Sequence, residues 1–337
     1  IRDRDEVHAD SIYSFKVTAV NQGGESFPSE VLSACVSSQN KGSIAIISGF
    51  DRTSGPAWFD DTQHAGFMDM VDQGVPYMMD LHTVGDQYDY RKDSPWLDDD
   101  SPGHGASYAD LEARVIPGNN FDFPIVHGRA IRNAGYSFVS LSDESVMNHS
   151  TDLQHFSMLD YLAGEERSTY MPKNDTVFHY QVWPEAMLEK LEDYLLGGGR
   201  LLVSGAHIAS DMHKHQQDER LGSLLKFKWR TSNASRLGQV YSVDPALAER
   251  DQQFRFNAGT DPKLYTVEGA DALEPVDSTA ITLMRYSENN MSAAVAFRDT
   301  YGVVSMGFPF ETLLDQQMRD QLMKRTINYL LNQKDDE

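Results

Sequence analysis

A helix, three glycines and a buried strand, all within residues 183–211, constrain the fold more than any other part of the chain. Pro184 suits the first turn of a helix, and apolar residues then recur at helical spacing as far as Leu195. The glycines at 197–199 end this helix, and residues 201–203 are a continuous apolar run, typical of a parallel strand buried on both faces. The sequence therefore predicts helices packed on a parallel sheet, the α/β class of fold.

Strands and helices alternate on either side of this stretch. We expect buried strands at 43–48, 76–81, 136–141 and near 176–180, and helices at 62–74 and near 153–163. Alternating segments then predict antiparallel hairpins within a β extension at about 221–307, at 226–229, 238–243, 263–267, 281–286, 293–297 and 303–307. An apolar stripe over 314–330 predicts a closing core helix. This order predicts a doubly wound sheet with an antiparallel extension.

Composition narrows the range of partners. The 337 residues, 40% of them hydrophobic, can build one large domain or two smaller ones. With 51 acidic against 29 basic residues the formal charge is -22, which repels a phosphate backbone, so we expect no nucleic acid partner. No apolar run reaches the roughly 18 residues that a bilayer span requires, so we expect no membrane span. Cys35 is the only cysteine and cannot form an internal disulfide.

The N-terminal segment has a different pattern of apolar and polar residues from the rest of the chain. Residues 13–31 alternate apolar and polar residues around a turn at 21–24, which predicts an antiparallel hairpin. The pattern resembles the last two strands of a fibronectin type III module, which implies that 1–38 is the C-terminal part of such a β-sandwich and 43–333 the main α/β domain. Because no leader segment follows Ile1, we expect a fragment or processed product of a longer, multi-domain chain.

Two further resemblances concern the main domain. Residues 190–211 resemble the nucleophile-elbow region of class I glutamine amidotransferase-like domains, which implies a flavodoxin-like sheet. The family's catalytic cysteine corresponds to Ala206 here, so we expect no cysteine-dependent amidotransferase chemistry. The blocks at 49–59, 118–131, 197–211 and 306–311 together resemble secreted Bacteroidetes proteins labelled xanthan lyases. That resemblance covers about residues 10–330 and implies an extracellular, periplasmic or cell-surface setting and a polysaccharide partner.

Candidate catalytic residues lie in irregular segments and at expected strand ends, where open α/β sheets bind ligands. Asp51 follows the strand at 43–48 and could act as an acid, or could form a loop salt bridge with Arg52. Asp122 and His127 could form an acid/base pair, or could tie down their own segment, 117–129, which we interpret as a binding loop. His207 follows the strand at 201–203 and could reach the same cleft, or could be structural.

Candidate binding residues are aromatic and polar, a combination that suits sugar rings and hydroxyl groups. Residues 85–108 form an aperiodic, aromatic-rich stretch that we interpret as an ordered loop over the site. The predicted substrate-binding residues are Arg52, Trp58, Tyr88, Trp96, Asn120 and His207, and the predicted catalytic residues are Asp122, His127 and Asp51.

Other chemistries have weaker sequence support, and we expect neither a metal nor a cofactor. The acidic run at 98–100 could bind calcium but matches no EF-hand spacing, and His213 and His215 lie on different faces of a helix. No G-x-S-x-G motif surrounds Ser142 or Ser204, although a serine hydrolase stays possible on the sequence. The sequence favours a polysaccharide lyase or glycan hydrolase. The alternative is a non-catalytic glycan-binding or scaffold domain that lost its nucleophile.

Overall fold

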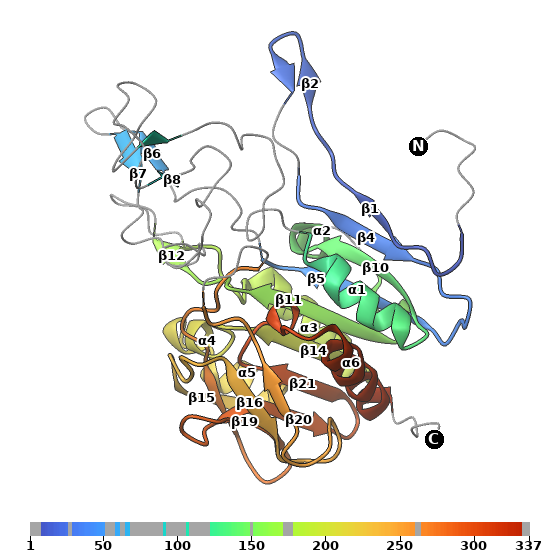
Figure 1. Ribbon diagram of the computed structural model, residues 1–337, viewed down its shortest axis with the longest axis vertical. Coiled ribbons are helices and arrows are strands. Elements are labelled where there is room, and N and C mark those ends of the chain that lie inside the picture. Colours follow the sequence, from blue (N-terminus) through green and yellow to red (C-terminus); the bar gives the residue numbers. More distant parts are fainter. Residues whose placement is uncertain are drawn as a thin grey trace.

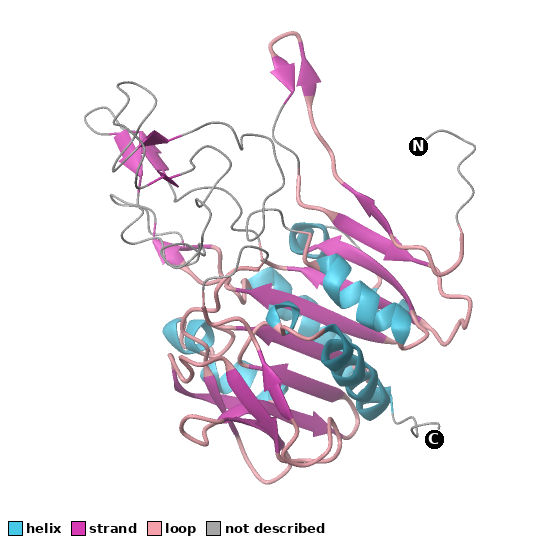
Figure 2. Cartoon of the chain, viewed as in Figure 1, coloured by secondary structure: helices cyan, strands magenta, loops and turns pink. Residues whose placement is uncertain are grey.

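An eleven-stranded mixed sheet organises the computed structural model of the chain (Figures 1 and 2). The structure describes residues 8–25, 29–50, 58–60, 65–67, 90–91, 106–107, 122–148, 151–170, 178–259 and 264–331. In spatial order the strands are β1 (Tyr13–Phe15), β4 (Leu32–Cys35), β10 (Ser137–Ser142), β5 (Ser43–Ser48), β11 (Met158–Gly164), β14 (Arg200–Gly205), β21 (Gly302–Met306), β20 (Ser292–Arg298), β19 (Ile281–Tyr286), β16 (Gln239–Ser242) and β17 (Gln253–Arg255).

The middle of the sheet is parallel and both ends are antiparallel. Strands β10, β5, β11, β14 and β21 pair in parallel, so their carboxyl ends meet at one edge. Antiparallel pairing begins at β20 and continues through β17 on one side, and it begins at β4 on the other. The α/β class and the antiparallel extension predicted from the sequence are therefore confirmed as a large mixed sheet. The flavodoxin-like assignment stays a prediction.

Helices cover both faces of the sheet because residues of the central strands alternate between two apolar clusters. In β5, Ile44 and Ile46 join the cluster that contains α1 (Pro124–Asn133) and α6 (Gln316–Leu331), whereas Ala45 and Ile47 join the cluster on the other face. That second face carries α3 (Glu185–Leu196) and α5 (Asp218–Leu225), with α2 (Asp143–Asn148) and α4 (Ser210–Lys214) beside them. Burial on both faces explains the continuous apolar runs in the sequence.

Short elements complete the described chain. Two-stranded sheets pair β2 (Val20–Asn21) with β3 (Gly24–Glu25), β6 (Trp58–Asp60) with β7 (Ala65–Phe67), β8 (Tyr90–Arg91) with β9 (Ala106–Ser107), β12 (Thr169–Tyr170) with β13 (Phe178–His179), and β15 (Phe227–Thr231) with β18 (Ala272–Pro275). Single 3-10 turns are η2 (Leu153–His155) and η3 (Phe310–Thr312).

The N-terminal hairpin joins the edge of the main sheet. Strand β1 pairs with β4, and β4 pairs in turn with β10, while the β2–β3 tip projects away from the sheet (Figure 1). The antiparallel hairpin predicted over 13–31 is therefore confirmed in its pairing of β1 with β4. Its descent from a fibronectin type III module, and the division of the chain at residues 38 to 43, stay predictions.

Four predicted elements differ from the structure, and the first is the helix expected at 62–74, because residues 65–67 form the strand β7 and pair with β6. Residues 153–163 were expected to form a helix, but they contain η2 and then β11, the central strand, because a short apolar run buried on both faces has no period that separates strand from helix. Residues 117–129 were interpreted as a loop, yet α1 begins at Pro124, a residue that suits the first helical turn. Residues 265–267 lie outside any strand. The elements expected at 62–74 and 76–81 lie, apart from β7, outside the described residues, as does most of the loop at 85–108.

Gly128 tests the packing of α1 on the sheet. A Cβ at this position would lie 2.1 Å from the Phe138 ring of β10, so Gly128→Ala forces the helix and the strand apart. We expect the free energy of unfolding, measured by urea denaturation, to fall by about 1–3 kcal/mol. The matched control is Gly259→Ala, where no atom lies within 4 Å of the added Cβ. An equal effect of both substitutions would contradict this account.

Candidate functional site

The turn after β14 lies at the carboxyl edge of the parallel strands and is built by close packing. A Cβ on Gly205 would approach the Ala163 side chain to 2.8 Å, so a larger residue would push β14 away from β11. Ala206 has no exposed surface, donates its N–H to Gly164 at 2.8 Å and accepts the Asp271 N–H at 2.9 Å. The residue at the position of the expected nucleophile is therefore a buried alanine that serves the packing of the turn.

Asp271, the residue directly before β18, fixes this turn. Its Oδ2 atom accepts the backbone N–H groups of Ala209 and Ser210 at 3.0 and 2.6 Å, and its Oδ1 atom accepts the Ser232 hydroxyl at 3.0 Å. Burial raises the pKa of the Asp271 carboxyl to about 7, although these donors favour its ionised form. The turn that carries His207 is thus held by a side chain next to the separate two-stranded sheet of β15 and β18.

His207 and Glu165 form a buried pair directly after β14 and β11. The His207 Nε2 atom lies 3.2 Å from Glu165 Oε2, and the two side chains are 4% and 3% exposed. Glu165 Oε1 accepts the Glu268 N–H at 2.9 Å, which fixes the carboxylate. Burial and the positive charge of Arg167 hold the pKa of His207 well below its ordinary value of 6.5, so the imidazole is neutral at pH 7. With its proton on Nε2 facing Glu165, Nδ1 carries the basic lone pair.

A pocket of about 330 Å³ opens beside this histidine. Its lining combines cationic, hydroxyl and amide side chains: Arg167, Ser168, His207, Ser210, Asp211, Lys214, Ser232 and Asn233, with Gly269. The Asp211 carboxylate is occupied by backbone donors, because it accepts the N–H groups of Ser168 and Val182 at 2.9 and 3.0 Å. The pocket therefore offers hydrogen-bond donors and positive charge, on a chain whose formal charge is -22.

His127 lies in a different environment. Its Nδ1 atom is 2.8 Å from Asp160 Oδ2 and its Nε2 atom is 3.2 Å from Glu311 Oε2, and all three side chains are fully buried. The Tyr265 hydroxyl donates to Glu311 Oε1 at 2.7 Å. Burial alone would lower the pKa of His127, but the Asp160 and Glu311 carboxylates raise it to about 9. His127 is therefore an imidazolium that links α1, β11 and η3.

Asp122 lies beside this cluster rather than in it. It is half-buried at the start of α1, and burial raises the pKa of its carboxyl. Its recorded backbone contact is through its carbonyl, which accepts the Ile125 N–H at 3.0 Å. The described residues contain no hydrogen bond between Asp122 and His127, so the structure places the two residues near each other in the chain but gives His127 other partners. Their catalytic roles stay predictions.

The remaining predicted site residues cannot be placed in the pocket. Asp51, Arg52, Tyr88, Trp96 and Asn120 lie outside the described residues. Trp58 begins β6, for which the structure describes only the backbone. Of the nine predicted residues, the described part of the chain brings only His207 to the pocket.

The residues that surround His127 and His207 were not predicted from the sequence. Glu165 and Arg167 come directly after β11, so they would have qualified as strand-end residues had 158–164 been interpreted as a strand. Asp160 was the one charged residue inside that apolar run, which is the signal of a buried charge with a partner. Glu311 closes the block at 306–311, which was noted for its resemblance alone.

Two other kinds of feature, a metal site and a membrane-spanning helix, are absent from the residues that the structure describes. Within these residues no group of three or more His, Cys, Asp or Glu side chains is arranged to hold a metal ion. The helices described are all too short or too polar to cross a bilayer.

Comparisons with known proteins give only distant structural likeness. No protein-family model and no curated protein matches the sequence. Similar solved structures include the exo-β-1,4-mannosidase Op5Man5 from Opitutaceae bacterium strain TAV5, at 13% identity and a TM-score of 0.39 over 62% of this chain and 31% of that one. Another is α-L-fucosidase isoenzyme 2 from Paenibacillus thiaminolyticus, at 13% identity and a TM-score of 0.36 over 62% of this chain and 29% of that one.

A third neighbour is the mmIFT52 N-terminal domain, at 12% identity and a TM-score of 0.40 over 60% of this chain and 88% of that one. The neighbours thus include two glycoside hydrolases at low identity, and the matched part spans less than a third of each of them. With TM-scores below 0.5, this likeness assigns no function.

The buried His127 cluster generates a pH prediction. The pKa of His127 is about 9 in the folded chain and about 6.5 in an unfolded one, so its contribution to stability is complete below pH 6.5. That contribution, about 3 kcal/mol, is lost as the pH rises from 6.5 through 9. Urea unfolding at several pH values should show this loss in the wild type and not in His127→Gln. The control His155→Gln removes an exposed histidine and should keep the slope; equal slopes in all three chains would refute the assignment.

Proposed function

We propose that this chain acts on an acidic polysaccharide, with its site in the pocket at the carboxyl ends of β11 and β14. The observation that carries the proposal is the neutral, Glu165-oriented imidazole of His207 beside Arg167 and Lys214 in one pocket. An imidazole that is neutral at pH 7 can accept a proton. The two cations suit a carboxylate on the same sugar unit.

The geometry favours elimination over hydrolysis. Glycoside hydrolysis in its usual form needs two carboxyl groups that flank the bond to be cleaved. The carboxylates near this pocket are occupied instead: Glu165 by the Glu268 N–H and His207, and Asp211 by two backbone N–H groups. A single base and the two cations fit removal of the proton next to a sugar carboxylate and cleavage of the neighbouring C–O bond, whose oxygen takes up the proton that the imidazole has accepted. The products are an unsaturated sugar acid and a new reducing end.

Arg167 links binding to the basicity of His207. In the described structure its positive charge lowers the pKa of the imidazole. A substrate carboxylate that pairs with Arg167 neutralises part of that charge, so the pKa of His207 rises as substrate binds. The base therefore becomes stronger in the complex than in the free protein.

We place this activity outside the cell, at the surface or in the periplasm, within a longer multi-domain protein. Support comes from the fibronectin-like N-terminal pattern and from the sequence blocks that resemble secreted proteins labelled xanthan lyases. The formal net charge of -22 argues against nucleic acid as the acidic polymer, because the charge of a phosphate backbone is denser than that of a uronate chain.

A second candidate is a glycan-binding or scaffold domain without catalysis. The observation that favours it is Ala206, a fully buried residue at the position where the resembling amidotransferase family has its nucleophile. In this case the pocket recognises a sugar through Arg167, Lys214 and the serine hydroxyls, and His207 only shapes the wall.

Substituting the histidine separates the two candidates. A panel of acidic and neutral polysaccharides is scored for binding, for new reducing ends and for ultraviolet absorbance of unsaturated sugars. We expect His207→Gln to lower turnover of an acidic polysaccharide at least about 100-fold while binding changes little, because only proton transfer is lost. Glu165→Gln should lower turnover as well, because it removes the negative partner that orients the ring.

The matched control is His213→Gln, a half-exposed histidine outside the pocket, which should keep full turnover. Binding without turnover in the wild type and in every variant would leave the binding domain as the function. Neither binding nor turnover on any polysaccharide would reject both candidates.

A further inference from the structure

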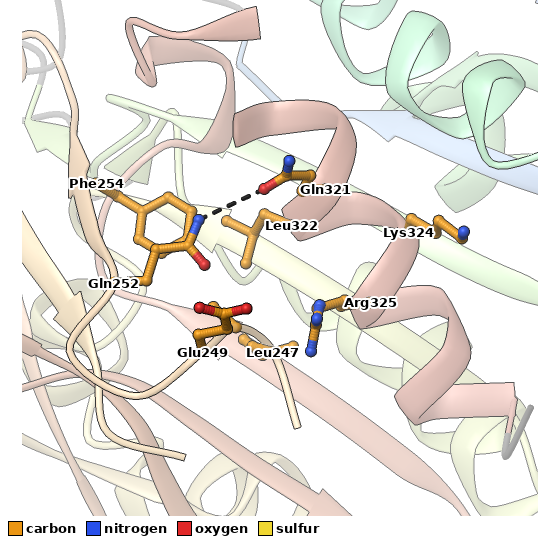
Figure 3. A pocket seen from close by; sticks show the side chains of 9 residues that line it. Leu247, Glu249, Gln252, Phe254, Gln321, Leu322, Lys324 and Arg325 are labelled. Carbon is orange, nitrogen blue, oxygen red and sulfur yellow. Dashed lines mark hydrogen bonds between the residues drawn. The ribbon is translucent and has the colours of Figure 1, made fainter. Parts of the chain in front are cut away.

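A second pocket lies on the face of the sheet covered by α6 and shares no lining residue with the pocket at the carboxyl edge (Figure 3). Its volume is about 360 Å³, near the lower end of the range of about 300–1,000 Å³ that is usual for small-molecule sites. One wall is the segment 247–254, and the other is the exposed side of α6 between Gln321 and Arg325.

The wall formed by residues 247–254 is fixed by hydrogen bonds within the protein. Ser242 has no exposed surface, donates its N–H to Gln252 O at 3.0 Å and accepts the Asp251 N–H at 2.8 Å. Its hydroxyl donates to Asp244 O at 3.0 Å. Asp251 has a φ of 65°, a conformation that costs free energy for a residue other than glycine and is retained because the surrounding bonds enforce it. These contacts fix both ends of the segment 243–251 to the end of β16.

The floor and the rim of this pocket differ in character. The floor consists of Leu247, Ala248, Phe254 and Leu322, which are at most 2% exposed and offer a ligand little apolar surface. The rim carries Glu249 and Gln252 from the loop, and Gln321, Lys324 and Arg325 from the helix. A ligand that fits this pocket is therefore held mainly by polar contacts at the rim.

The rim groups make few bonds with each other. Gln252 Nε2 donates to Gln321 Oε1 at 3.5 Å, a long hydrogen bond, and Arg325 donates to Pro245 O at 3.4 Å. Among the described residues, Glu249 and Arg325 line the same pocket without an ion pair within 4.0 Å. Donors and acceptors thus line the same rim.

We propose that this second pocket binds a neutral sugar unit whose hydroxyl groups donate hydrogen bonds to Glu249, accept them from Arg325, and do both with the amides of Gln252 and Gln321. Neighbouring hydroxyls each donate and accept, so they satisfy a carboxylate, an amide and a guanidinium at once. An anion would face Glu249, and a cation would face Lys324 and Arg325, so the mixed rim suits a neutral ligand that both donates and accepts hydrogen bonds. The small apolar surface of the floor excludes a lipid or an aromatic ligand as the main occupant.

This second site does not rest on the chemistry proposed at the carboxyl edge. Two sugar contacts on one chain would let a polysaccharide bind at both, and the second contact would become intramolecular once the first is made. The neutral specificity of this pocket also distinguishes it from the cationic pocket beside His207.

Side-chain amide NMR tests the proposal residue by residue. The probes are the neutral trisaccharides cellotriose, maltotriose and β-1,4-mannotriose, with glucuronate as the charged comparison, titrated into the whole chain. We expect at least one trisaccharide to shift the side-chain amide signals of Gln252 and Gln321, which are assigned with Gln252→Ala and Gln321→Ala. Shifts at Asn233 report separately on the pocket beside His207.

Matched substitutions then locate the contacts. Glu249→Gln should weaken trisaccharide binding about tenfold, since a hydrogen bond to a charged group is lost. Glu189→Gln makes the same chemical change on the exposed surface of α3, across the sheet, and should leave binding unchanged. Absence of shifts at both glutamines with every trisaccharide would overturn the proposal. The proposal would also be overturned if glucuronate bound more tightly than every trisaccharide and Arg325→Gln abolished that binding, because the site would then be an anion site.

Discussion

The burial of Asp160 in the central strand is the constraint on which the rest of the described structure depends. β11 is covered on both faces, so this carboxylate has no access to water and needs a charged partner within the protein. His127 supplies that partner from α1, and Glu311 shares it from η3, so one imidazolium fixes a helix, a strand and the turn after β21 to each other. Asp160 Oδ1 keeps no hydrogen-bond partner among the described atoms, which makes the arrangement sensitive to loss of the positive charge.

The two buried histidines show how local charge decides what the same side chain can do. His127 faces two carboxylates and carries a proton at neutral pH, so it serves as a fixed cation. His207 faces one carboxylate but also lies in the field of Arg167, and it is neutral. Only the second histidine lines a pocket, and only the second has a nitrogen lone pair to offer. Burial is nearly complete for both, so burial alone would not have distinguished a structural residue from a site residue.

Elements whose burial is uniform along their length could be predicted from the sequence. Contacts between residues far apart in the sequence could not. The strands at 43–48 and 201–203 and the closing helix were recognised because their apolar patterns are set by the local backbone. The run at 158–164 has the same uniform burial but was interpreted as a helix, and Glu165 and Arg167 were missed with it. Asp122 was predicted as the partner of His127 because it lies five residues away in the sequence. The partners in the structure, Asp160 and Glu311, lie 33 and 184 residues away, and a local sequence pattern cannot predict contacts over such separations.

The same long separations determine when the carboxyl edge can form. Glu165 is fixed by the N–H of Glu268, the turn after β14 is held by Asp271, and His127 is completed by Glu311. During synthesis the chain emerges from its N-terminus, so the strands that carry the pocket are made well before the residues that set its geometry. The carboxyl edge of the parallel strands therefore lacks these fixing contacts until the last quarter of the chain has been synthesised. The site is consequently among the last parts of the described fold to be assembled, and its formation reports that the whole chain has folded.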